Sequence, residues 1–157
     1  MAHSYLCVRV HYIWSTYRRT PWLSPEWRER LYRYFAAVTR RKGGVLLCAG
    51  GVRDHVHLYV SLPPDVSIAR LVNALKANSS RWIHESFPKL RSFAWQHGYS
   101  AFSVSRFSEA GLIKYIRNQE QHHNEHTFAR EITRLAARHG LAPRPERPAH
   151  SNGLTHP

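Results

Sequence analysis

The first part of the chain alternates between two kinds of position with a period of two residues. In residues 5–15 (YLCVRVHYIWS) one set of alternate positions holds Cys7, Arg9, His11 and Ile13. A β-strand sends successive side chains to opposite faces, so this segment is predicted to be a strand. Its apolar face consists of Leu6, Val8, Val10, Tyr12 and Trp14.

Two longer segments repeat apolar residues at the steps of an amphipathic helix. Ser24, Pro25 and Glu26 supply a cap, a proline for the first turn and an early carboxylate, which predict a helix from there to about Lys42. A second helix is predicted from the capping Ser67 to just before Pro88. The apolar stripes are Trp27, Leu31, Phe35 and Val38 in the first helix, and Ile68, Leu71, Val72, Leu75, Trp82 and Ile83 in the second.

Shorter apolar runs predict the remaining strands. Residues 45–49 and 55–62 are separated by a hairpin signal at 50–54, and the aromatic-rich segment 93–105 is typical of an exposed or edge strand. Two further helices are expected over 109–123 and 127–138. The order β-α-β-β-α-β-α-α predicts an α+β fold: a ferredoxin-like antiparallel sheet with helices, followed by C-terminal helices.

Domain organisation follows from where the pattern stops. Residues 1–140 form one predicted domain, and residues 141–157 lack a core-forming pattern and are expected to be a disordered tail. Cys7 and Cys48 lie in apolar segments without metal-site spacing, so both are expected to be buried free thiols of a cytoplasmic protein. No apolar run is long enough to cross a membrane.

The charge changes this picture towards a polyanionic partner. The chain has 23 Lys and Arg against 10 Asp and Glu, a formal net charge of +13. Such a surface favours nucleic acid, because neutralising phosphates releases condensed counterions. No phosphate-binding loop of the nucleotide-hydrolysing kind is present, so no nucleotide cofactor is expected.

Candidate chemistry appears on the strand 55–62 and on the helix 109–123. His55 and His57 share the strand face opposite the apolar Val56 and Leu58, where two imidazoles can bind one divalent ion with Asp54 as an outer partner. Alone, such a pair is more often a polar surface feature. Tyr115 and Gln119 stand one turn apart on a single helix face, as a phenol nucleophile and an amide ligand, or simply as a core tyrosine and a solvated glutamine.

Four segments in this order resemble the HUH transposases with one catalytic tyrosine, the small insertion-sequence type and its relatives associated with repetitive extragenic palindromes. They are VHYIWSTYRRTPWL, GGVRDHVHLYVSLPP, WQHGYSAFSVS and YIRNQEQHH. The resemblance implies that His55, His57 and Gln119 bind Mg²⁺ or Mn²⁺ and that Tyr115 attacks single-stranded DNA. It also implies a 5′-phosphotyrosine intermediate, hairpin-flanked sites, a homodimer, and a bacterial or archaeal protein located at the nucleoid.

The remaining candidates are weaker, and a different function stays open. Trp95, Tyr99 and Phe102 are candidates for base stacking or for core packing, and the histidines 122, 123 and 126 for a zinc cluster or phosphate contacts. The alternative function is a domesticated protein that binds hairpin DNA or RNA without cutting it. The candidate DNA contacts are Arg9, His11, Lys76, Arg81, Arg106, His122 and His123.

Overall fold

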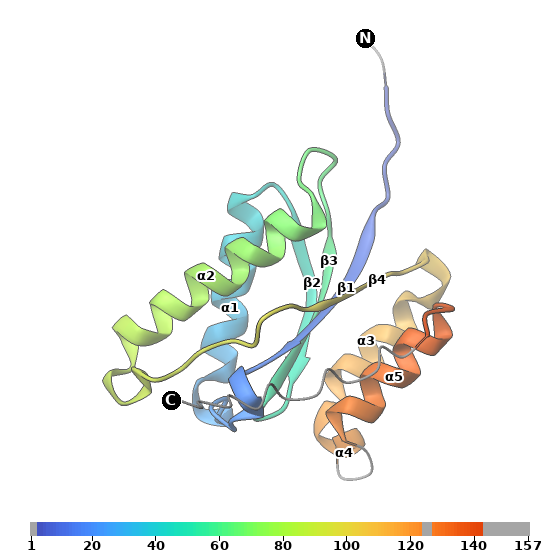
Figure 1. Cartoon of the computed structure of the whole chain (residues 1–157). Coiled ribbons are helices and arrows are strands. Elements are labelled where there is room, and N and C mark those ends of the chain that lie inside the picture. Colours follow the sequence, from blue (N-terminus) through green and yellow to red (C-terminus); the bar gives the residue numbers. More distant parts are fainter. Residues whose placement is uncertain (1–2, 124–126, 143–157) are drawn as a thin grey trace, which may run out of the picture.

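A four-stranded antiparallel sheet forms the centre of the protein in the computed structural model, which describes residues 3–123 and 127–142. The strand order is β2-β3-β1-β4 (Figure 1), so β3 and β1 are central. The predicted α+β ferredoxin-like class is confirmed, because β3 lies between β2 and β1 and is antiparallel to both. The strands are β1 Arg9–Ser15, β2 Val45–Gly51, β3 His55–Ser61 and β4 Ser100–Ser103.

Helices cover both faces of the sheet. The helices α1 and α2 lie on one face, and α3 and α5 lie on the other, with α4 at one end (Figure 1). Among the described residues no helix combines the length and apolar character needed to span a membrane. The helices are α1 Pro25–Arg41, α2 Ile68–Ser86, α3 Glu109–Arg117, α4 Gln119–His123 and α5 Phe128–Arg138, with short 3-10 turns at Tyr17–Arg19, Pro88–Leu90 and Arg106–Ser108.

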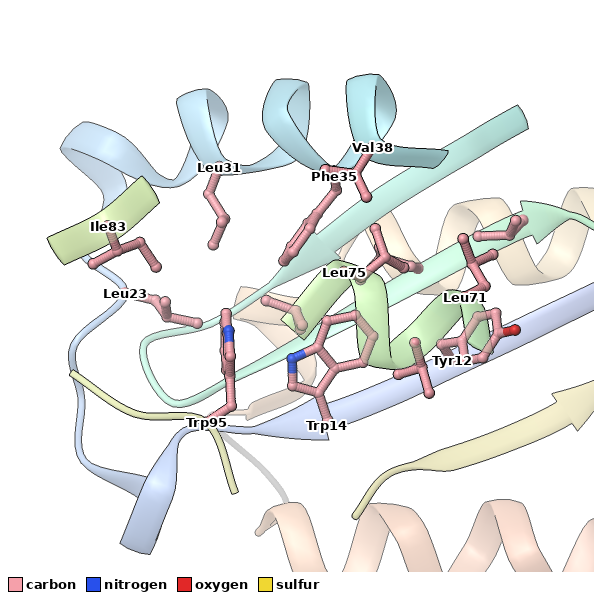
Figure 2. Packing of buried hydrophobic residues seen from close by; sticks show 14 of the residues in the cluster. Tyr12, Trp14, Leu23, Leu31, Phe35, Val38, Leu71, Leu75, Ile83 and Trp95 are labelled. Carbon is pink, nitrogen blue, oxygen red and sulfur yellow. The ribbon is translucent and has the colours of Figure 1, made fainter. Parts of the chain in front are cut away.

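The main core fills the space between the sheet and the first two helices. Trp14 of β1 contacts Phe35 of α1 and Trp95 edge-on, with ring centroids 5.6 and 5.8 Å apart (Figure 2). The helix starts follow the predicted caps, since Ser24 accepts a hydrogen bond from the Glu26 amide and Ser67 accepts one from the Arg70 amide. The apolar set of β3, consisting of Val56, Leu58 and Val60, points into this core and is fully buried.

The first strand is shorter than the alternation predicts. Leu6 and Val8 are 61% and 43% exposed, and Cys7 is exposed, so the prediction of a buried Cys7 thiol is wrong. Pairing ends because the Val8 carbonyl accepts the last hydrogen bond from the Leu62 amide, and the two prolines that follow have no amide hydrogen to donate. Cys48 is buried as expected.

Two later elements also differ from their predicted bounds. Only Ser100–Ser103 of the segment 93–105 forms a strand, because the Lys76 ammonium binds the carbonyl groups of Gln96 and Gly98 and holds that stretch as a loop. The single helix expected over 109–123 is divided at Asn118 into α3 and α4. The tail beyond residue 142 lies outside the described residues.

A close backbone contact fixes α3 against the sheet. A Cβ atom built on Gly50 of β2 would lie 2.3 Å from the carbonyl oxygen of Ile116 in α3. Only a glycine permits this approach, since real Cβ contacts are essentially never that short. Arg28 of α1, itself buried, ties the start of α4 to the same edge through ion pairing with Glu120 and a hydrogen bond to the Gly51 carbonyl. The helix carrying Tyr115 is therefore docked on its own sheet.

We expect Gly50→Ala to lower the free energy of unfolding by about 1–3 kcal/mol, because the added methyl group meets backbone that cannot move aside cheaply. Gly111→Ala is the matched control: nothing lies within 4 Å of its added Cβ and it stands inside α3. That substitution should instead stabilise the protein by about 0.5–1 kcal/mol. Urea unfolding measures both, and an unchanged midpoint for Gly50→Ala would contradict the docking.

Candidate metal and nucleophile site

The second face of β3 carries a buried polar cluster. His55 and His57 point away from the main core, as the strand alternation predicts, yet both have no solvent exposure. The helices α3 and α5 bring Tyr115 and Glu131 against them. The structure therefore brings three of the residues proposed from the sequence, His55, His57 and Tyr115, together with Glu131, and the buried Gln119 side chain is hydrogen-bonded to the backbone of Tyr115.

Glu131 is the link between the two histidines. Its carboxylate oxygens lie 3.4 Å from Nε2 of His55 and 3.2 Å from Nε2 of His57, and the residue is 7% exposed. It is the fourth residue of α5, a helix that begins when the Thr127 hydroxyl accepts a hydrogen bond from the Arg130 amide. One ligand atom from each of the three residues falls within a span of 4.8 Å, which is close enough for one metal ion.

Outer partners orient both imidazoles. Nδ1 of His55 lies 2.7 Å from the Asp54 carboxylate, and Nδ1 of His57 lies 2.9 Å from Nε2 of His11. These contacts use the Nδ1 atoms and direct both Nε2 atoms towards the same carboxylate. A partner on one ring nitrogen that sets the role of the other is the usual arrangement around a metal-binding histidine. Asp54 thus takes the outer position expected from the sequence, and His11 supports the site from β1.

The buried amide of Gln119 offers a further oxygen atom that a cation could bind. Its side chain is 1% exposed, and its Nε2 donates to the backbone carbonyl of Tyr115 at 3.3 Å. Its Oε1 is buried with no hydrogen-bond partner among the described residues. A buried acceptor without a donor costs free energy, and a metal ion would satisfy it. Two imidazoles, a carboxylate and an amide oxygen suit a divalent ion such as Mn²⁺ or Mg²⁺.

Tyr115 reaches the same carboxylate from α3. Its hydroxyl donates a hydrogen bond to Glu131, and its ring meets that of His57 edge-on, with centroids 5.7 Å apart. Burial, followed by the hydrogen bond and charge of Glu131, raises the pKa of the phenol far above its ordinary value. The phenol is therefore protonated at neutral pH and must lose its proton to act as a nucleophile.

The helix α5 closes the cluster off from solvent. The ring of Phe128 lies against His55 with centroids 4.6 Å apart, and the guanidinium carbon of Arg19 lies over the same Phe128 ring, 5.8 Å from its centroid. With His55, His57 and Gln119 at most 1% exposed, bulk water does not reach the ligand atoms in this arrangement. Interactions between charges are strong in such an enclosed place.

Most of the other candidates lie away from this cluster. Lys76 binds loop carbonyls, and Arg81 bonds Asn78 on the exposed side of α2, across the sheet from the histidines. Arg106 is 72% exposed and pairs with Glu109. Trp95 belongs to the main core, whereas Phe102 of β4 lies near His11. The side chains of the histidines 122, 123 and 126, and with them the zinc alternative, lie outside the described residues.

Glu131 is not predicted as a site residue by the sequence, in which the last helix is defined only by its apolar stripe. Phe128, Ile132 and Leu135 stand on one face, and Glu131 occupies the same face between them. A carboxylate inside an apolar stripe needs a buried partner, because burying an unpaired charge is very costly. That interruption was the available signal.

Comparison with known proteins gives the class to which this fold and site belong. The chain is 29% identical over 117 residues to the ISDra2 transposase TnpA of Deinococcus radiodurans, covering 71% of this chain and 84% of that protein. It is 26% identical over 125 residues to the IS200 transposase of Salmonella typhimurium, covering 76% and 81%. These relatives are transposases, enzymes of DNA recombination.

The family model described as "Transposase IS200 like" matches residues 4–119, and the chain belongs to this family. A crystal structure of a Deinococcus radiodurans R1 transposase superposes with a TM-score of 0.62 at 28% identity, covering 76% of this chain and 96% of that one. The fold also matches a REP-associated tyrosine transposase bound to a REP hairpin, with a TM-score of 0.58 at 17% identity, covering 91% and 87%. The predicted family and transposase class are confirmed.

His11 and His55 make opposite contributions to stability as pH changes. Burial, and then the charge of His57, hold the pKa of His11 well below its ordinary 6.5, although Glu131 opposes and His139 adds to the effect. Burial also opposes the charged form of His55, but Asp54 and Glu131 outweigh it and raise the pKa of His55. His55 therefore stabilises the fold at low pH and loses that contribution above 6.5, whereas His11 destabilises it below 6.5.

We expect metal-free protein to lose stability as the pH falls below about 6.5, because His11 binds a proton there in the unfolded protein but stays neutral in the folded protein. His11→Gln should flatten that part of the curve while leaving the part above 6.5 unchanged. Urea unfolding in EDTA between pH 5 and pH 8, in roughly half-unit steps, measures the difference. Parallel curves for the two proteins below pH 6.5 would contradict the assignment.

Proposed function

We propose that this transposase is a metal-dependent single-stranded DNA endonuclease and strand transferase that works through a 5′-phosphotyrosine on Tyr115. The observation that carries the proposal is one shared carboxylate: Glu131 contacts Nε2 of both strand histidines and accepts the hydrogen bond of the Tyr115 hydroxyl. A cation site and a nucleophile are thereby held at the same point, which the attack on a phosphate requires.

His55, His57, Glu131 and Gln119 would hold the cation. The two histidines and Glu131 already converge, and the amide oxygen of Gln119 is a buried acceptor one helical turn from Tyr115. When bound, a divalent ion supplies positive charge that polarises a phosphate oxygen and stabilises the charge that develops there. Glu131 is an addition to the ligand set that the family resemblance implies.

The chemistry of the chain's own residues centres on the phenol. The Glu131 carboxylate accepts its hydrogen bond and is placed to receive its proton. The phenolate oxygen then forms a bond to phosphorus while the bond from phosphorus to the 3′ oxygen breaks, and that oxygen leaves as a 3′-hydroxyl after gaining a proton. One ester replaces another, so rejoining needs no nucleotide cofactor.

Hairpin-bearing single-stranded DNA is the substrate we infer. The net charge of +13 suits a polyphosphate, and the matching REP-associated transposase is bound to a hairpin. We further propose that the functional domain spans residues 1–140 and that it acts as a homodimer at the nucleoid.

We expect a denaturant-resistant protein–DNA adduct when the protein meets single-stranded DNA carrying the hairpin beside its own gene in the presence of Mn²⁺. Tyr115→Phe should give none, because it lacks the attacking oxygen. Tyr34→Phe is a matched control, since Tyr34 stacks on Trp82 at the far face of the sheet. If Tyr115→Phe still forms the adduct, or the wild type forms none with any flanking strand, the proposal is wrong and a non-cutting binder remains.

We expect Mn²⁺ to bind the protein without DNA, and Glu131→Gln to weaken that binding by at least the roughly 10- to 100-fold that loss of an outer partner costs a metal site. Glu85→Gln, at an exposed position of α2, is the matched control. Calorimetric titration or the paramagnetic resonance signal of free Mn²⁺ reports the affinity. Equal affinity for Glu131→Gln and wild type would show that Glu131 is not a ligand.

A further inference from the structure

A groove runs along β4 and has Tyr115 as one of its lining residues. It has a volume of about 630 Å³ and lies between β4, α3 and the end of α5. His11 lines it close to the metal candidate, and Arg138 and His139 line it from α5 and its C-terminal cap. Pockets of this size hold molecules as large as a nucleotide.

Aromatic rings form a continuous series from the candidate metal site into this groove. His57 stacks on His11 with centroids 5.1 Å apart, and His11 lies 6.4 Å from Phe102 at a tilt. Phe102 in turn stacks on His139, with centroids 4.8 Å apart and ring planes 19° apart. Phe102 is 6% exposed, but His139 is exposed, so the series ends at a ring that another planar group can reach.

The charge and polarity of the groove suit a nucleic-acid strand. None of the described residues that line it is acidic, and Arg138 supplies a positive charge. Three serines, Ser103, Ser105 and Ser108, offer hydroxyl groups along one wall. Phe107 follows at the mouth as a 99% exposed aromatic side chain. Stacking rings beside positive charge are how proteins bind unpaired bases and their backbone.

We infer that this groove binds an unpaired nucleotide next to the phosphate that Tyr115 attacks, with its base stacked on His139 and its backbone beside Arg138. The inference rests on the proposed function, because the nucleophile identifies the strand that occupies the groove. Its role is to fix the scissile phosphate at the phenol. The series of rings behind His139, from Phe102 to His57, gives the stacked base a rigid support that ends at the metal candidate.

Binding can be tested without cleavage by making every variant in Tyr115→Phe protein. The probe is a fluorescent oligothymidylate of about 12 nucleotides, within the site sizes usual for single-strand binding. We expect His139→Ala to weaken binding about fivefold or more, the equivalent of one lost base stack. Arg138→Gln should lower the slope of log affinity against log salt by about 0.7, the value for one phosphate contact on a single strand.

His97→Ala and Arg91→Gln are the matched controls, since both positions are exposed and neither lines the groove. They should bind within twofold of the parent, and thermal unfolding confirms that each exposed substitution leaves the fold intact. If His139→Ala and Arg138→Gln behave like these controls, the groove inference is overturned even where wild-type protein forms its Tyr115 adduct. If wild-type protein forms no adduct but His139→Ala and Arg138→Gln weaken binding as expected, the proposed chemistry is overturned and the groove inference stands.

Discussion

The contact between one carboxylate and two imidazoles determines the arrangement of the second layer of this protein. Glu131 meets Nε2 of His55 and of His57 in a place where neither histidine is exposed. Charged and polar groups so enclosed are costly unless they are paired, so α5 keeps its position largely because its glutamate has these partners. The apolar contact of Phe128 with His55 adds to that, but it could not by itself offset a carboxylate buried alone.

In the proposed metal site, the same contact would make protons and a metal ion compete. Without a cation, the glutamate and Asp54 favour a proton on His55 and raise its pKa. A divalent ion takes the place of such a proton, and imidazole nitrogen binds it only in the neutral form. Burial and the charge of His57 oppose proton uptake by His11, so the imidazole of His11 stays neutral and supports His57 by hydrogen bonding. In the proposed function, charge would thus be concentrated where the DNA phosphate binds.

Local pattern predicted the fold because each helix and strand has its own period and its own end signals. Ser24, Ser67 and the alternation of β3 placed α1, α2 and the two faces of the central strand. The first strand was overestimated because its end depends on Pro63 and Pro64 of a neighbouring segment. His55 and His57 lie in one strand, and Tyr115 and Gln119 lie four residues apart, so short local motifs were enough to propose them. Glu131 depends on how α5 packs, and its only trace in the sequence is a carboxylate inside an apolar stripe.

The cover that α5 forms over the site has a consequence for the lifetime of any ester on Tyr115. In open solvent, water competes with a DNA 3′-hydroxyl for attack on a phosphotyrosine. Each hydrolysis by water would leave a broken strand that cannot be resealed. With Phe128 against His55, and the ligand side chains almost wholly enclosed, the proposed reaction would take place with little water near the phosphorus. Under the proposed mechanism the attacking group would then be the 3′-hydroxyl of a DNA end held alongside, and the cover formed by α5 would keep the broken strand able to rejoin.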